Sequence, residues 1–575
     1  MKNKVSCLFT AGLLCAALAP FKLFAERPSK PNILFIILDD LNDSVEGFGG
    51  HPQARTPNID RLAQRGVRFL NAANNAPLCS PSRPSMLTGL YPHTTHYFGN
   101  PSESEGADGQ YKYAWKHEVF DKSVTWMQHF RNNGYAVYGA GKIDHNFAER
   151  WSDWWDPKTA TRNYGPQPSW GPFPFSGTGL KPNNNYAMNF DLACSHPSLP
   201  DVYKLSFFAP LSNVPTTPPD PKTGFKGYTG WYLYNHPYRY ISETDRDPMP
   251  DELLAQYAET FFAERSSSNE KRPFFLNIGI NRPHAPLTAP KKYFNLFPLD
   301  EIQLAPRKEG DLDDCAEFLW KDFKNNQVSH TSGFQMYRHT AEKGYMKRWT
   351  QAYLACVAFA DDMVGRILTA LENSPYAENT LVVITSDNGY HMGEKNYKFK
   401  NSAWEEATRI PLVIAGPDVA KGANCTKPVS LIDLYPTFND FCGLDNHPHP
   451  HLPLDGHSLR PLLKDPLAGE WSGPDVALTS LVARNLSNNK PIPEGIGKPE
   501  AQTYSVRSER YRYIICPDGS TELYDHQKDP QEWTNLADNP EFSNVRKKLH
   551  AAAEKLTGKT LGTFYKLNSY EPRTQ

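Results

Sequence analysis

The sequence lacks the features that mark several large classes of protein. Its 61 lysines and arginines are balanced by 63 aspartates and glutamates, and this near-neutral charge argues against a nucleic-acid-binding protein. It has nine cysteines but no Cys-x-x-Cys pair, which argues against a zinc-finger type of site. Beyond the N-terminus it has no apolar run long enough to span a bilayer. The 575 residues, 39% of them hydrophobic, instead suffice for one large domain and a smaller one.

The one long apolar run lies at the N-terminus and is typical of a secretory signal. Lys2 and Lys4 precede an apolar stretch at 5–19, and Leu23-Phe24-Ala25 follows it. We therefore expect residues 1–25 to be a signal peptide and the protein to be periplasmic or secreted, with no membrane span after signal removal. Cleavage removes three lysines and no acidic residue, which takes the formal net charge from −2 to −5. Disulfides are possible in such an oxidising compartment, although the cysteine spacing does not decide their pairing.

Residues 30–445 alternate between apolar runs of strand length and amphipathic helical patterns. We expect strands at 32–38, 67–70, 135–139, 273–279, 381–385 and 411–415, and helices at 57–66, 123–130, 250–262 and 353–371. Continuous apolar strands suit a parallel sheet that is covered on both faces. The sequence therefore predicts an α/β catalytic domain at 30–445, with a large mixed, mostly parallel sheet sandwiched by helices.

The pattern changes at about residue 446. A Pro- and His-rich linker leads to short alternating strands at 504–507, 511–516 and 522–525, and a last helix is expected at 542–556. Asp518-Gly519 is a hairpin-turn signal between the last two strands. We expect residues 446–575 to form a smaller C-terminal subdomain with an antiparallel sheet.

Acidic and amide side chains follow two of the apolar strands. Asp39-Asp40 ends the first, and Asp387-Asn388 follows the strand at 381–385. Open α/β sheets place ligands at the carboxyl ends of their strands. A lone Asp-Asp pair is more often a solvated turn, but two such strand ends side by side make a four-oxygen site that suits Ca²⁺ or Mg²⁺.

A third polar feature begins at Cys79. In Cys79-Ser-Pro-Ser-Arg83-Pro-Ser-Met-Leu-Thr-Gly89, the prolines favour a turn and Gly89 is suited to end a short helix. This places Cys79 near a helix N-terminus, where free N–H groups favour anions, with the cation of Arg83 in reach. An isolated thiol in such a loop would be inert and partly buried.

The spacing Cys-x-Pro-Ser-Arg, three residues, Leu-Thr-Gly resembles the signature of the formylglycine-dependent sulfatases, in the alkaline-phosphatase-like superfamily. The resemblance implies that a formylglycine-generating or sulfatase-maturating enzyme oxidises Cys79 to formylglycine (3-oxoalanine), an aldehyde whose hydrate attacks the sulfur of a sulfate ester. It also implies one Ca²⁺ per chain. The implied calcium ligands are Asp39, Asp40, Asp387, Asn388 and the modified Cys79.

The same resemblance assigns the remaining catalytic groups. Arg83 and Lys142 would steady the formylglycine and the sulfate, and His145 would take a proton from the hydrate. His284 and Lys400 would hold the sulfate and assist the leaving oxygen. Lys398 is the less favoured choice in place of Lys400.

Within the family, the chain is most similar to the iduronate-2-sulfatases. The similarity is carried by Gly141-Lys142-x-x-His145, Pro283-His284-x-Pro286 and Ala407-Thr408-x-x-Pro411-Leu412. It implies an exo-acting enzyme on a 2-O-sulfated uronic acid of a sulfated oligo- or polysaccharide. Asn281 and Asn401 stand where those enzymes carry His and Tyr near the sugar, so the sugar stays open.

Three alternatives remain. The first is a sulfatase acting on another sulfated polysaccharide, such as an algal galactan. The second is a phosphoryl-transfer enzyme of the same superfamily. The third is a non-catalytic glycan binder in which Cys79 stays a thiol.

Overall fold

The structure is a computed structural model that describes residues 30–99, 118–145, 210–213, 228–233, 236–285, 287–322, 325–329, 332–485, 490–491 and 495–565. The predicted signal peptide at 1–25 lies outside the described residues. Of the helices in these ranges, none combines the length and the apolar character needed to cross a membrane.

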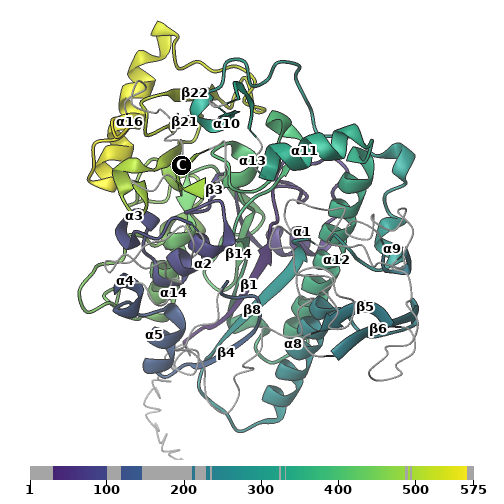
Figure 1. The fold of residues 1–575 in the computed structure, drawn as a ribbon. Helices are drawn as coiled ribbons and strands as arrows, with labels where there is room; N and C mark the ends of the chain where they lie inside the picture. Colours follow the sequence, from purple (N-terminus) through teal and green to yellow (C-terminus); the bar gives the residue numbers. More distant parts are fainter. Residues whose placement is uncertain are drawn as a thin grey trace, which may run out of the picture.

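A mixed, mostly parallel sheet forms the centre of the molecule, as predicted, and it has seven strands where the sequence predicted six (Figure 1). Its strands, in spatial order, are β15 (Ala423–Cys425), β2 (Gly66–Phe69), β14 (Leu412–Ala415), β11 (Thr380–Ser386), β1 (Asn32–Asp39), β8 (Phe274–Pro283) and β4 (Ala136–Gly141). β1 pairs in parallel with β11 and β8, and β8 pairs in parallel with β4. Only β14 runs antiparallel to its two neighbours. The carboxyl ends of four consecutive strands therefore meet at one edge.

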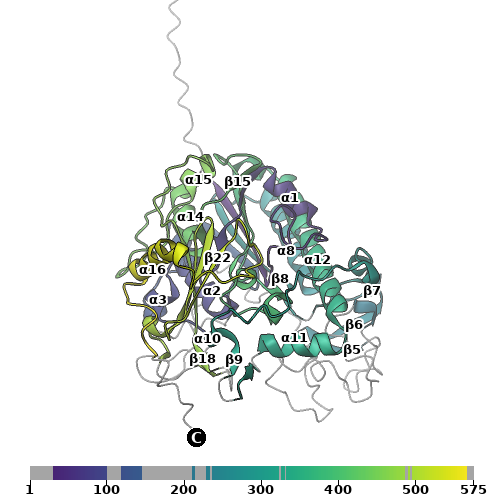
Figure 2. The same ribbon diagram turned by 90° about the horizontal axis from the view of Figure 1, so that it is seen from above.

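Alternate residues of β1 face two separate layers of helices. Leu34, Ile36 and Leu38 belong to the apolar cluster under α12 (Met346–Glu372), α8 (Pro250–Ser267) and α1 (Pro57–Ala63). Ile33 and Phe35, with Ile37, belong to the cluster under α2 (Cys79–Thr88), α5 (Trp126–Asn132) and α14 (Leu434–Cys442). Figure 2 shows the two layers on opposite sides of the sheet. Because both faces are covered, the strand carries no polar residue between Asn32 and Asp39.

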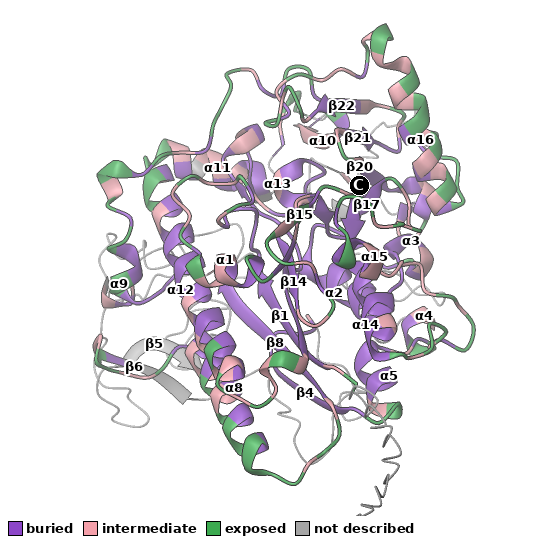
Figure 3. Ribbon diagram, turned by 180° about the vertical axis from the view of Figure 1, so that it is seen from behind, coloured by how far each residue is buried: buried purple, intermediate pink, exposed green. Residues whose placement is uncertain are grey.

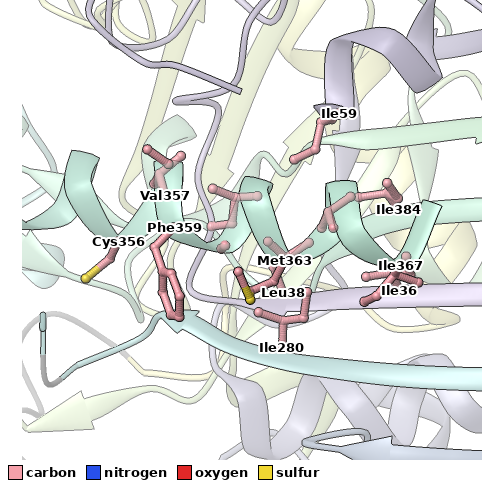
Figure 4. Packing of buried hydrophobic residues seen from close by; sticks show 14 of the residues in the cluster. Ile36, Leu38, Ile59, Ile280, Cys356, Val357, Phe359, Met363, Ile367 and Ile384 are labelled. Carbon is pink, nitrogen blue, oxygen red and sulfur yellow. The ribbon is translucent and has the colours of Figure 1, made fainter. Parts of the chain in front are cut away.

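The helix α12 crosses the sheet with a continuous apolar stripe. Met363 lies beside Leu38 and Ile280, and Ile367 lies beside Ile36 (Figure 4). This packing fixes the helix over the strands whose ends carry the polar residues.

Several predicted helix boundaries were wrong: the helix expected at 353–371 begins at Met346, and the helix expected at 250–262 ends at Ser267. The helix expected at 123–130 runs instead from Trp126 to Asn132. Thr125 is its N-cap: its side chain accepts from the Gln128 amide, and the Gln128 side chain accepts from the Thr125 amide. This capping box satisfies two free N–H groups, which fixes the start of the helix after residue 125.

The C-terminal part holds the expected antiparallel sheet, of order β17-β20-β21-β22, and the helix α16 (Ser543–Thr557). The strands are β17 (Ala477–Leu481), β20 (Thr503–Arg507), β21 (Tyr511–Ile515) and β22 (Thr521–Asp525). Figure 3 shows this sheet buried and much of α16 exposed. The exact division of the chain at 445/446 stays a prediction.

Buried ion pairs join the C-terminal sheet to the large domain. Glu405, at the start of α13 (Glu405–Thr408), accepts from Arg507 at 3.2 Å and also from Arg512. Trp404 donates to Glu522 at 2.9 Å. The His-rich segment is also anchored, since the buried His449 lies 2.8 Å from the Thr88 carbonyl at the end of α2. All six described cysteines are free thiols, and Cys194 lies outside the described residues.

Candidate active site

The predicted site residues converge at the edge where β1, β8, β11 and β4 end. Asp39 is the last residue of β1, and Asp387 directly follows β11. Because these strands are parallel neighbours, residues almost 350 positions apart come together: the Asp40 amide donates to Asp387 Oδ1 at 3.3 Å. α2 begins at the same edge, with Cys79 as its first residue.

Cys79 is buried between a histidine and a lysine. Its Sγ lies 3.1 Å from His145 Nδ1 and 3.6 Å from Lys400 Nζ. Leu78 precedes the helix in an extended conformation, and Gly89 ends it with φ 67°, as predicted. Burial raises the pKa of the thiol, although the charges of Lys142 and Lys400 oppose that shift. The helix N-terminus and the cations together favour negative charge beside Cys79.

Asp39 belongs to two overlapping groups of side chains that could hold a metal ion. Ligand atoms of Asp39, Cys79 and Asp387 lie within 4.8 Å of one another, as do those of Asp39, Asp40 and His284. Two oxygens bound to one Ca²⁺ at about 2.4 Å can be at most about 4.8 Å apart. The buried oxygens Asp39 Oδ1 and Asn388 Oδ1 accept no hydrogen bond from the residues that the structure describes. The donor set therefore fits a hard divalent cation.

Three basic side chains pair with the three carboxylates. Arg83 Nε donates to Asp387 Oδ2 at 2.7 Å, Lys400 Nζ lies 2.5 Å from Asp40 Oδ1, and Lys142 Nζ donates to Asp39. Burial raises the pKa of Asp387 to about 6, even though the charge of Arg83 lowers it. Burial alone would raise the pKa of Asp39. The nearby positive charges, that of Lys142 above all, outweigh the effect of burial and hold this pKa well below its usual value.

Of the two predicted histidines, His284 is buried and His145 is half-buried, and the pKa of each is lowered. Burial and the nearby charge of Lys142 lower the pKa of His145 to about 3, and burial lowers the pKa of His284 well below its usual value. His284 Nδ1 lies 2.7 Å from the Ala285 carbonyl, so Nδ1 carries the proton. Its Nε2 is then the basic nitrogen, 3.6 Å from Asp40 Oδ2. Neutral imidazoles at these positions can accept a proton.

The structure separates the two candidate lysines. Lys398 Nζ lies 4.1 Å from the centre of the Trp349 ring and has no hydrogen-bond acceptor among the described residues. Burial lowers its pKa well below the usual value. Lys400 is therefore the lysine that reaches Cys79, although the roles assigned to the site residues stay predictions.

Sequence reasoning missed the residues that hold the site in place. Asp251, in the first turn of α8, accepts from the amides of Asn281 and Arg282 at 2.8 and 3.1 Å. It also accepts from Asn281 Nδ2 at 3.1 Å. Tyr353, on α12, donates its hydroxyl to the Asp40 carbonyl at 2.8 Å. An acid in the first turn of a helix and a tyrosine in an apolar stripe are both ordinary patterns, so neither stood out.

Comparisons with known proteins agree with this arrangement. The family model described as Sulfatase matches residues 31–444. A protein described as a sulfatase from Formosa agariphila is 31% identical, over 96% of this chain and 92% of its own length. Human iduronate 2-sulfatase is 26% identical, over 74% of this chain and 66% of its own length.

Two solved structures share the fold. A phosphonate monoester hydrolase of Agrobacterium radiobacter superposes with a TM-score of 0.62 at 21% identity, covering 92% of this chain and 96% of its own. A 2-O GAG sulfatase superposes with a TM-score of 0.57 at 21% identity, covering 92% and 93%. The family model spans most of the chain, and a relative matched over nearly its full length is 31% identical; this chain accordingly belongs to the sulfatase family, the hydrolases of sulfate esters.

Proposed function

We propose that this sulfatase removes sulfate from a sulfated glycan, as an exo-acting enzyme on a 2-O-sulfated uronic acid, by way of a formylglycine made from Cys79. The observation that carries the proposal is the position of Cys79. It begins α2 among two carboxylates, a neutral histidine and the ammonium of Lys400. The names of the relatives, iduronate 2-sulfatase and 2-O GAG sulfatase, support the choice of sugar.

Each residue has a task that its environment supports. Formylglycine would supply, in its hydrated form, a hydroxyl that can attack sulfur and a second one that can expel the sulfate. Asp39, Asp40, Asp387 and Asn388 would hold Ca²⁺, which would neutralise charge on the sulfate oxygens. Lys142 and Lys400 would bind those oxygens, and preorganised cations in a buried site stabilise spreading charge far more than water does.

The histidines would move the protons. His145 Nδ1 lies 3.1 Å from Cys79 Sγ. The pKa of the ring is lowered to about 3, so the ring is neutral, and Nδ1 is the acceptor when Nε2 carries the proton. It can therefore accept a proton from a hydroxyl at that position. His284 Nε2 lies 3.6 Å from Asp40 Oδ2 and would, once it has taken up a proton, donate it to the leaving oxygen. General acid–base groups of this kind contribute about 10²–10⁴-fold to a rate.

The first test is the mass of the peptide that contains Cys79, in protein from its native host. We expect it to be lighter than the unmodified peptide by about 18 Da, the difference between cysteine and formylglycine. The unmodified mass would favour a glycan binder with a free thiol. Cys79→Ala should abolish turnover while keeping the thermal unfolding midpoint.

The second test concerns the substrate. Aryl sulfate, aryl phosphate and an aryl phosphonate monoester should be compared at equal concentrations, since a phosphonate monoester hydrolase shares this fold. We expect sulfate to be turned over fastest, and a preference for either phosphorus ester would refute the proposed chemistry. Release of sulfate from defined oligosaccharides should then be highest with a terminal 2-O-sulfated uronic acid. Preference for a sulfated galactan would instead support the algal-polysaccharide alternative.

A further inference from the structure

We propose that Tyr353 is a positioning residue for the metal site: its hydroxyl holds the turn at Asp40 so that the Asp40 carboxylate faces the cation. The inference rests on the proposed function, because it takes Asp40 as a metal ligand. Tyr353 touches neither Cys79 nor any other predicted catalytic side chain through its hydroxyl, and it acts through the backbone of Asp40.

The turn at Asp40 has an unfavourable backbone conformation. Asp40 has φ 64°, in the left-handed region that residues other than glycine rarely adopt. Such a conformation persists only when surrounding contacts enforce it. Here the Asp40 amide donates to Asp387 Oδ1 at 3.3 Å, and the Leu41 amide donates to Ser386 Oγ at 3.0 Å. Both contacts attach the turn to the end of β11.

The hydroxyl of Tyr353 supplies the contact on the opposite side. It donates to the Asp40 carbonyl at 2.8 Å and accepts from the Asn42 amide at 3.0 Å. It also lies 3.1 Å from Asn42 Oδ1. One buried oxygen atom thus satisfies a carbonyl and an amide two residues apart, across the turn. Among the described residues, no other group donates to the Asp40 carbonyl, so loss of the hydroxyl would leave that buried group unpaired.

The tyrosine is rigidly mounted. Its ring is 1% exposed and stacks on Tyr390, with centroids 5.5 Å apart and planes at 22°. It lies one helical turn before Val357, in the apolar cluster through which α12 packs over the sheet. Burial raises the pKa of the phenol well above its usual value, so the hydroxyl keeps the proton that it donates.

The turn controls where the carboxylate lies. With the backbone held as it is, Asp40 Oδ1 accepts from Asn388 Nδ2 at 2.7 Å and lies 2.5 Å from Lys400 Nζ. Its Oδ2 lies 3.6 Å from His284 Nε2. Relaxation of φ to a negative value would rotate this carboxylate away from all three groups. Tyr353 therefore connects the core packing of α12 to the geometry of the site.

Tyr353→Phe tests this directly, because it removes the hydroxyl and keeps the ring. Ca²⁺ binding to chelator-treated full-length protein would be measured by isothermal titration calorimetry, and kcat with an aryl sulfate would be measured against Ca²⁺ concentration. We expect the Ca²⁺ Kd to rise about ten-fold, as loss of one buried hydrogen bond would produce. We also expect kcat to fall at low Ca²⁺ and to recover at saturating Ca²⁺.

Tyr390→Phe is the matched control. It removes the same atom from the stacked ring. The contact of Tyr390 with the turn is kept, because it is made by the backbone: the Tyr390 carbonyl accepts from Asn42 Nδ2 at 2.9 Å. We expect this variant to bind Ca²⁺ as the wild type does. A purely structural role for Tyr353 would lower the unfolding midpoint of the metal-free protein and leave the Ca²⁺ Kd unchanged.

The outcomes separate the two proposals. If the wild type binds Ca²⁺ and the Tyr353→Phe variant binds it with equal affinity, the role of Tyr353 is overturned and the proposed function stays intact. An equal loss of affinity in both tyrosine variants would also overturn it. A wild type that binds no Ca²⁺ would refute the metal site itself, and the role of Tyr353 with it.

Discussion

The carboxylate of Asp251 offers a direct test of how the end of β8, which directly precedes His284, is held in place. Asp251 is 1% exposed and accepts three hydrogen bonds: from the backbone amides of Asn281 and Arg282, and from Asn281 Nδ2. These residues precede His284 at the end of β8. Asp251→Ala would leave two buried amides without an acceptor, at the point where the strand delivers His284 to the site.

The expected cost follows from those contacts. An orphaned buried donor costs about 1–3 kcal/mol, so two of them cost roughly 2–6 kcal/mol. This is a large fraction of the 5–15 kcal/mol by which folded proteins are typically stable. Burial raises the pKa of Asp251, while the charge of Arg282 and the three hydrogen bonds lower it. Asp251→Asn keeps one acceptor oxygen, so its cost should be about half that of Asp251→Ala.

The assay combines thermal unfolding with steady-state kinetics on an aryl sulfate. We expect the unfolding midpoint and kcat to fall in the order wild type, Asp251→Asn, Asp251→Ala. Because His284 would act on the leaving oxygen, kcat should fall more than KM changes. If Asp251→Ala had the midpoint and kcat of the wild type, the reasoning from orphaned amides would be refuted.

Three further predictions concern buried charges and the metal. Lys398→Met should raise the unfolding midpoint and keep kcat, because it removes a buried amine that has no hydrogen-bond acceptor among the described residues. Lys400→Met should lower kcat by about 100-fold or more. Equal effects of the two substitutions on kcat would contradict the separation of the two lysines. Burial lowers the pKa of His93 from 6.5 to about 4, so the unfolded chain binds more protons between these values and stability should fall by up to roughly 3 kcal/mol as pH drops from 6.5 to 4. His93→Phe, which preserves stacking on Tyr91, should flatten that slope in melts recorded against pH, and an unchanged slope would exclude His93 as its source. A chelator should lower both activity and midpoint, and Ca²⁺ at 100 times its Kd should restore about 2.7 kcal/mol; full activity without any divalent ion would exclude a catalytic metal.

Much of the fold followed from local patterns. An apolar run such as 32–38 must be a covered strand, because its side chains are apolar on both faces. The polar residues that follow it must then lie at a sheet edge, as Asp39 does. The boundary error at 123–130 came from a capping box, since a hydrophobic pattern does not show where a helix begins.

The composition of the candidate site was likewise readable from the sequence. Cys79 and Arg83 belong to one contiguous motif whose spacing is itself the signal. The strand-end acids and His284 stand at places where parallel sheets gather ligands. These inferences needed only the type of each residue and its distance along the chain.

The tertiary structure alone decided which groups touch. Lys398 and Lys400 are equivalent by spacing, yet a turn with φ 119° at Phe399 sends one to the Trp349 ring and the other to Asp40. The supports Asp251 and Tyr353 were also invisible, because they act on backbone groups far away in the sequence. A motif specifies which side chains are present, but pairing energies depend on distances and burial, and these are set by strands and helices that pack only in the folded chain.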